Sequence, residues 1–313
     1  MDGAMQTNRA EKTMFPIRCV LTQARQKALF ARSSYNAEKN DTARFFSRLK
    51  ERESMSVQPL DLSVARREWA RVRRTNPLVH CMTNVVACAF TADVLAAAGA
   101  SPAMLPAKQE APDFTRIAAA LLVNVGTLTA PDADAMLLTT RAALYAQKPW
   151  VLDPVAAGVS PWRDSVIAKL VLNSPTVIRG NPSEIVALSG GEKTAKGVDS
   201  ILTSADALKA AETLASGAQT IVAVTGQIDY ITDGTRTLSV SGGNAKVGRI
   251  VGTGCSLSAL VAALIAGADD TLVAAASACA LAKSAAQTVG DKPYGSFHTA
   301  YLDALETISL QSL

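Results

Sequence analysis

The chain has 313 residues, of which 49% are hydrophobic and 5% aromatic, and its formal net charge is +4. This length and apolar content suffice for a sizeable core in one large α/β domain or two small ones, and no apolar run approaches the ~20 residues of a bilayer-spanning helix. The positive charge is concentrated in residues 1–54, which hold 11 Lys and Arg against 6 Asp and Glu, whereas the remainder holds 20 against 21. The composition therefore gives no argument for binding to nucleic acid or to a membrane.

The cysteines are five in number, and none stands in a Cys-x-x-Cys pair; the chain has only two histidines. An odd number of cysteines without metal-ligand spacing makes a disulfide framework or a zinc site unexpected. We expect reduced thiols and a cytoplasmic protein.

The first 54 residues lack sustained hydrophobic periodicity and are rich in Arg, Lys, Ser, Asn and Gln, which is typical of a flexible segment. Three interpretations stay open: an organellar transit peptide, although acidic residues are unusual in one; a basic tail that contacts a partner; or sequence upstream of a true start at Met55. The globular pattern begins at Leu62. We therefore expect a basic, disordered extension over residues 1–61 and one domain over residues 62–313.

The domain opens with a helix, a strand and a second helix. Residues 64–72 have amphipathic helical spacing, and residues 77–80 are apolar and strand-like. Asn84 and its neighbour Thr83 are suitable caps for an alanine-rich helix that runs to residue 98, where Gly99 ends it.

Short apolar runs then alternate with helical segments as far as residue 224. Near-continuous apolar strands separated by helices are typical of a parallel sheet covered on both faces. The expected strands are 103–105, 119–125, 150–152, 176–178 and 220–224.

An Asp-Gly pair, Asp233-Gly234, separates two alternating segments, residues 228–232 and 236–240, and this pattern predicts a β-hairpin. The sheet is therefore expected to be mixed. Three helices are expected to follow, over residues 256–266, 271–289 and 297–310.

Several of these strands end in polar or glycine residues. In an open α/β sheet the ligand crevice lies outside the carboxyl ends of the strands, so chemistry is expected there. The segments concerned are Asn124-Val125-Gly126, Asp153-Pro154, Arg179-Gly180-Asn181 and Thr225-Gly226.

Four polar side chains at these ends each have two interpretations. Asn181 and Glu184 are spaced as a helix capping box, or Glu184 contributes to a Mg²⁺ that accompanies nucleotide phosphates. Arg179 either contacts phosphate or forms a surface salt bridge. Asp153 caps a loop or is a ligand.

A tight turn at Gly252-Thr253-Gly254-Cys255 opens directly into a helical pattern. Unpaired backbone N–H groups and the helix dipole favour an anion at such a start. The same positive field should lower the pKa of the Cys255 thiol and favour the thiolate. The alternatives are glycines of purely structural importance and a cysteine that acts as a small buried hydrophobe.

In their order and spacing, seven motifs resemble those of hydroxyethylthiazole kinases, and the resemblance covers roughly residues 62–310. The motifs are residues 77–84, 99–104, 124–128, 152–155, 179–184, 224–226 and 251–255. The resemblance implies a ribokinase-like fold, a three-layer α/β/α architecture with a mostly parallel central sheet. It also implies ATP-dependent phosphorylation of the primary alcohol of 4-methyl-5-(2-hydroxyethyl)thiazole in thiamine salvage, with Mg²⁺.

The resemblance assigns roles to individual residues. It implies that Met104 and Gly252 contact the thiazole, that Arg179 and Thr225 contact the nucleotide, and that the enzyme is a homotrimer with active sites between subunits. Asn84 and Met104 would then face a neighbour's Cys255. The full expected site is Cys255 as the catalytic residue; Met104, Gly252 and Asn84 for the substrate; Arg179, Thr225, Gly254 and Asn181 for ATP; and Glu184 and Asp153 for the metal.

One departure concerns Cys255, because the wider ribokinase-like group usually carries an aspartate at this position. Phosphoryl transfer depends mainly on positioning and charge neutralisation, so a strong base is not required. We expect Cys255 to orient the hydroxyl, as a thiolate or as a hydrogen-bond acceptor. Two alternatives are kept: a kinase of the same fold for a pyrimidine or a sugar, and a non-catalytic sensor of thiazole or nucleotide.

Overall fold

The described residues, 56–190 and 202–312 of a computed structural model, build a nine-stranded sheet in the order β1-β9-β8-β7-β6-β5-β4-β2-β3. The strands are β1 (Val57–Pro59), β2 (Leu78–Met82), β3 (Ser101–Ala103), β4 (Ala120–Asn124), β5 (Trp150–Asp153), β6 (Val177–Gly180), β7 (Ile221–Val224), β8 (Asp229–Thr232) and β9 (Thr237–Val240). The helices are α3 (Leu62–Thr75), α4 (Cys88–Ala97), α5 (Ala111–Ile117), α6 (Ala130–Tyr145), α7 (Pro161–Val171), α8 (Pro182–Leu188), α9 (Leu208–Ala218), the 3₁₀ turn η1 (Ala245–Arg249), α10 (Thr253–Ile265), α11 (Thr271–Val289) and α12 (Tyr294–Leu310).

The sheet is mixed, as the hairpin signal predicted. Strands β3, β2, β4, β5, β6 and β7 pair in parallel, whereas β8 is antiparallel to both β7 and β9. Gly234 occupies the β8–β9 turn with a φ of +84°, a left-handed conformation that favours glycine. The expected hairpin is confirmed.

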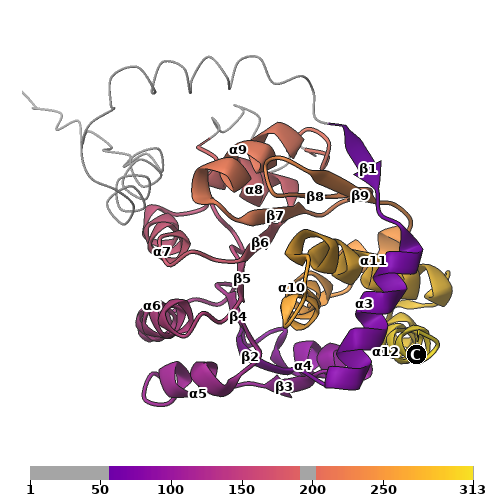
Figure 1. Ribbon diagram of the computed structural model, residues 1–313, viewed down its shortest axis with the longest axis horizontal. Coiled ribbons are helices and arrows are strands. Elements are labelled where there is room, and N and C mark those ends of the chain that lie inside the picture. Colours follow the sequence, from indigo (N-terminus) through magenta and orange to yellow (C-terminus); the bar gives the residue numbers. More distant parts are fainter. Residues whose placement is uncertain (1–55, 191–201, 313) are drawn as a thin grey trace, which may run out of the picture.

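Helices cover both faces of the sheet, as Figure 1 shows: α5, α6, α7, α8 and α9 lie on one side and α3, α4, α10, α11 and α12 on the other. Residues of one strand alternate between the two cores. In β4, Leu121 and Val123 pack under α6, whereas Ala120 and Leu122 face the layer that holds α10. This alternation explains why a strand buried on both faces is apolar throughout, and the expected three-layer fold is confirmed.

The folded part begins earlier than the boundary at residues 61 and 62 that the sequence suggested. Val57, Gln58 and Pro59 form the edge strand β1, which pairs in parallel with β9 from Val57 opposite Thr237. All three residues are exposed, so the segment has no apolar pattern that could have revealed the strand. Strand β1 therefore lies within the extension that we predicted to be disordered. The three interpretations of residues 1–54, as a transit peptide, a basic tail or sequence before a start at Met55, concern residues that lie outside the described ones.

Two further boundaries differ from the prediction. Helix α4 begins at Cys88 rather than just after Asn84, because Asn84 closes a preceding turn by accepting a hydrogen bond from the Ala87 amide (3.0 Å). Strand β3 lies two residues earlier than expected, since its register pairs Leu78 with Ser101.

Among the described helices, α11 has the length and apolar composition that a membrane-spanning helix needs. The expectation from the sequence that no apolar run is long enough is therefore wrong for this helix. Of its most apolar window, 72% is buried inside the protein. Packing between α3, α10 and α12 accounts for this composition, because a helix covered on all sides is apolar all round.

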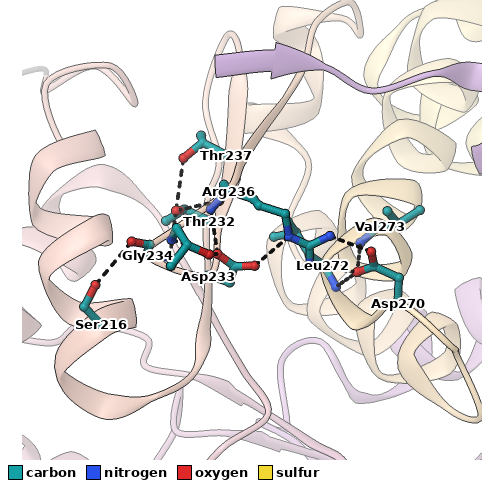
Figure 2. A network of polar contacts seen from close by, with 10 residues as sticks. Ser216, Thr232, Asp233, Gly234, Arg236, Thr237, Asp270, Leu272 and Val273 are labelled. Atoms are coloured by element: carbon teal, nitrogen blue, oxygen red, sulfur yellow. Dashed lines mark hydrogen bonds and ion pairs between the residues drawn. The ribbon is translucent and has the colours of Figure 1, made fainter. Parts of the chain in front are cut away.

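A charged network ties the β8–β9 turn to the start of α11 (Figure 2). Arg236 donates hydrogen bonds to Asp233 (2.9 Å) and to Asp270 (2.7 Å), and Asp270 caps α11 by accepting from the amides of Leu272 and Val273. Because β8 is antiparallel to β7, this turn lies at the edge of the sheet opposite to the carboxyl ends of the parallel strands.

Candidate active site

The carboxyl ends of β4 and β5 bring two buried polar side chains together. Asn124 and Asp153 stand opposite each other in the strand register, and the Asn124 amide donates to Oδ2 of Asp153 at 2.6 Å. Ser258, on α10, donates to the same oxygen at 2.8 Å. Sheet and helix therefore meet at a single carboxylate oxygen.

Asn84 extends this network to the cysteine at the start of α10. Its Nδ2 donates to Oδ1 of Asn124 at 2.9 Å and lies 3.1 Å from the Cys255 sulfur, to which it also donates. A Cβ atom on Gly126 would lie 2.7 Å from the Asn84 Cβ, so only glycine lets Asn84 occupy this position. The network fixes the sulfur relative to three strand ends.

The turn before Cys255 has the geometry that the two glycines predicted. Gly252 is the N-cap of α10 with a φ of +89°, and a Cβ there would lie 3.1 Å from the Phe90 ring. The first backbone amides of α10 therefore begin directly after a left-handed turn, next to Cys255, and the macrodipole favours an anion there.

The Cys255 thiol does not have the lowered pKa that the helix field led us to expect. Burial raises its pKa, the charge of Asp153 raises it further, and the hydrogen bond from Asn84 opposes these effects only in part. The expected lowering of the pKa is wrong for this geometry, because burial and a neighbouring carboxylate both disfavour the thiolate.

Arg179 joins the end of β6 to the end of β7 and to α10. Its Nη2 donates to Thr225 Oγ1 at 2.5 Å and its Nη1 donates to the Gly254 carbonyl at 3.1 Å. Its Nε is buried and has no partner among the described residues. A buried guanidinium with an unused donor is suited to a phosphate oxygen, whereas the alternative of a surface salt bridge does not fit a side chain that is 9% exposed.

Glu184 forms the capping box that its spacing to Asn181 allowed. Glu184 Oε2 accepts from the Asn181 amide at 2.8 Å, and Asn181 Oδ1 accepts from the Glu184 amide at 2.9 Å. Glu184 Oε1 also accepts from the Ala156 amide in the loop after β5, at 3.0 Å. The carboxylate therefore links the ends of β5 and β6.

Burial and two neighbouring charges set the pKa of the Asp153 carboxyl. Burial raises the pKa of Asp153 to about 6; the charge of Arg179 lowers it and that of Glu184 raises it again. Among the described residues, both hydrogen bonds to the Asp153 carboxylate go to Oδ2, and neither reaches Oδ1. Groups of three or more His, Cys, Asp and Glu are absent from the described ranges, but Mg²⁺ needs only one or two carboxylates, with waters and phosphates as its other ligands. The residues present fit Mg²⁺ in that form.

The structure does not bring every expected residue into contact. Met104 is half-buried and packs against the core on the α10 side of the sheet. Asn84 reaches Cys255 of its own chain, so the expectation that it faces a neighbour's Cys255 is wrong. Ser258 was missed, since a serine in an alanine-rich helix gives no signal until α10 is placed against β5.

A cavity of about 230 Å³ lies beside this network, on the α6 side. Asn84 and Asn124 line it together with Met82 on β2, Cys88 on α4, Met136 on α6 and Leu128 in the loop before α6. Its walls are mostly apolar with a few polar groups, as in sites for small organic molecules. Met104 and Gly252 are not among its lining residues.

Comparisons with known proteins agree with the geometry. Residues 69–311 match the model of the hydroxyethylthiazole kinase family. A hydroxyethylthiazole kinase of Tolumonas auensis is 48% identical over 252 residues, which cover 79% of this chain and 94% of that protein. The structure of a hydroxyethylthiazole kinase protein from Pyrococcus horikoshii is 37% identical with a TM-score of 0.71 and covers 78% of this chain and 92% of its own. A ribokinase-like superfamily protein from Enterococcus faecalis, 14% identical with a TM-score of 0.58, covers 83% of this chain and 99% of its own and shares the fold.

Proposed function

The chain belongs to the hydroxyethylthiazole kinase family, and we propose that the network at its strand ends carries out the reaction of that family. The chain is a kinase that transfers the γ-phosphoryl group of ATP to the alcohol of 4-methyl-5-(2-hydroxyethyl)thiazole, a step of thiamine salvage. For this transfer we propose roles for individual residues of the network.

The position of Arg179 is the observation that supports this site most strongly. Its guanidinium lies between Thr225 at the end of β7 and Gly254 in the first turn of α10. A nucleotide held at Thr225, Asn181 and Gly254 would place its phosphates where Arg179 and the amides of α10 neutralise the charge that develops during transfer. Cys255 is the next residue along that helix.

Asp153 and Glu184 would hold Mg²⁺, Asp153 through its free Oδ1. The ion would neutralise phosphate charge and orient the transferred group. The raised pKa of Asp153 suits this assignment, because a buried carboxylate without a nearby cation is unfavourable and a metal ion removes that cost.

Cys255 would act by position rather than as a strong base. Burial and the charge of Asp153 raise the pKa of its thiol, which disfavours the thiolate that a strong base would require. Asn84 fixes the sulfur at 3.1 Å, so the thiol can orient the substrate hydroxyl toward the phosphoryl group. A loose transition state does not require that the proton leave early.

The thiazole would bind where Met104 and Gly252 approach Cys255, in a homotrimer whose neighbouring subunit contributes Met104. In support, Val85, Val86 and Val251 are each more than half exposed and lie within two residues of Asn84 or Gly252, so these apolar side chains beside the site are not covered by their own chain. Light scattering on the purified chain tests the trimer.

We also propose a cytoplasmic location, as expected from the unpaired cysteines.

A coupled assay of ADP release separates the candidate functions. We expect release with hydroxyethylthiazole and little with hydroxymethylpyrimidine, on the full chain and on a chain that starts at Met55. Release with the pyrimidine alone would indicate a kinase for another alcohol. Tight thiazole binding without release of ADP would support the sensor and contradict the kinase.

A further inference from the structure

We propose that Lys283, on α11, is a positioning residue for the nucleotide side of the site, and that its ammonium group serves as a built-in monovalent cation for the β7–β8 turn. This inference rests on the proposed nucleotide position at Thr225, the residue that precedes the turn.

The Lys283 ammonium group is surrounded by three oxygen atoms. Its Nζ donates to the carbonyls of Gly226 (2.9 Å) and Gln227 (3.0 Å), and it lies 3.3 Å from Oδ1 of Asp229. The side chains of Lys283 and Asp229 are 13% and 4% exposed. Two carbonyls and a carboxylate around one buried positive charge form the kind of oxygen shell that a small cation occupies.

These contacts fix the orientation of the carbonyl groups in the β7–β8 turn. Lys283 holds the carbonyls of Gly226 and Gln227, Ser204 donates to the Ile228 carbonyl, and Oδ1 of Asp229 accepts from the Gly226 amide at 2.9 Å. Three consecutive carbonyls are therefore bound to side chains of the protein. Carbonyl dipoles tied in this way are not free to turn their negative ends toward phosphates bound at Thr225.

The charge of Lys283 matters as much as its hydrogen bonds. Asp229 is buried, which raises its pKa, and the charges of Lys283 and, to a smaller extent, Arg179 oppose that effect, so Asp229 interacts electrostatically with both cations. Without Lys283, the carboxylate of Asp229 would keep its hydrogen bond from the Gly226 amide but lose its ion-pair partner, and its negative charge would weaken the attraction of Arg179 for a polyanion. Lys283 thus supports Thr225 and Arg179 without touching the nucleotide itself.

The test compares Lys283→Ala with the wild-type chain by ADP binding in a calorimeter and by steady-state kinetics. We expect the Kd for ADP and the KM for ATP to rise at least about tenfold, with the KM for the thiazole within twofold of wild type. Ammonium or potassium chloride should restore most of the ATP affinity of the variant, and tetramethylammonium chloride at equal ionic strength should not. The wild type should not respond to the choice of cation.

A second variant covers the case in which Lys283→Ala does not fold. Lys283→Ala combined with Asp229→Asn removes both buried charges, and its KM for ATP should stay raised because the Gly226 and Gln227 carbonyls still lack their donor. Arg236→Met is the matched control, since Arg236 ties the β8–β9 turn, at the far edge of the sheet, to the N-cap of α11, and the KM for ATP of this variant should not change.

Three results would overturn the proposal: an unchanged Kd for ADP in the single variant, an unchanged KM for ATP in the double variant, or equal increases in the KM for ATP and for the thiazole. ADP binding does not depend on the acceptor alcohol. A failure of the proposed substrate would therefore appear in the wild-type kinetics and leave this test intact.

Discussion

Two polar networks lie at opposite edges of the same sheet, and they differ in how completely their groups are paired. At the far edge, Asp233, Arg236 and Asp270 are partly exposed, and their ionised forms are favoured: the pKa of Asp270 is lowered, first by its hydrogen bond from Arg236. At the site edge, burial raises the pKa of both Asp153 and Cys255.

The difference indicates which network is built for stability and which for a ligand. A carboxylate surrounded by donors stabilises the fold, whereas a buried carboxylate with a free oxygen is kept at a cost that a bound cation removes.

The largest effect is expected for Asp153→Asn. Both hydrogen bonds to Asp153 go to Oδ2, so an asparagine oxygen there can keep them while the charge at Oδ1 is lost. Turnover should fall by about 10³-fold, whereas the free energy of unfolding in metal-free buffer should stay equal or rise. Assays of ADP release and urea unfolding measure the two quantities. A variant that is both active and less stable would show that Asp153 stabilises the fold, as Asp233 and Asp270 do, and does not act in catalysis.

The pH dependence of stability should have opposite signs at the two edges. The folded-state pKa of Asp153 is about 6, above its ordinary value of 3.8, so in metal-free protein its proton stabilises the fold and stability falls as pH rises through 6, by roughly 3 kcal/mol at most. For Asp233, partial burial alone would raise the pKa, but hydrogen bonds from Thr235 and Arg236 lower it to about 2. Its contribution is therefore present above pH 3.8 and is lost as pH falls toward 2.

Urea unfolding of the wild type, Asp153→Asn and Asp233→Asn between pH 2 and 8, with a chelator present, tests these signs. Asp153→Asn should weaken the dependence between pH 4 and 7 and leave the acid limb intact, and Asp233→Asn should do the reverse; Asp229 and Asp270 keep part of each limb. If the free energy of unfolding depended on pH in the same way in both variants, the two networks would not differ as proposed.

A smaller effect is expected at Cys255. If the thiol only orients the hydroxyl, Cys255→Ala should lower kcat about tenfold, and Cys255→Ser, which keeps a polar hydrogen, should lose less. A loss of about 10²-fold or more in both variants would instead indicate general-base catalysis. Wild-type kcat in both would remove Cys255 from the mechanism.

The smallest effect is expected for Asp270→Ala, which removes the cap of α11. The free energy of unfolding should fall by about 1 kcal/mol, because two backbone amides lose their acceptor. The kcat and both KM values should not change. Asp269→Ala is the matched control, since Asp269 is the exposed neighbour in the sequence. A change in kcat would show that the far edge is coupled to the site.

The sequence alone determined much of the architecture, because local patterns report local structure. Apolar runs such as 119–125 identified the strands, Asp233-Gly234 identified the hairpin, and the spacing of Asn181 and Glu184 allowed the capping box that forms. The polar residues at the ends of β4, β5, β6 and β7 also predicted that their side chains would gather at one edge of the sheet, since parallel strands share one carboxyl edge.

Only the tertiary structure decided how these residues act. The bond from Asn84 to Cys255 spans 171 positions, and Ser258 reaches Asp153 across 105, so no local pattern could reveal either contact. The protonation of Cys255 depends on burial and on Asp153, which the helix-field argument could not include. The β1 strand and the Lys283 shell likewise depend on partners far away in the chain. Hydrogen bonds, burial and pKa values are properties of the folded surroundings, whereas the sequence records only which residues are available to form them.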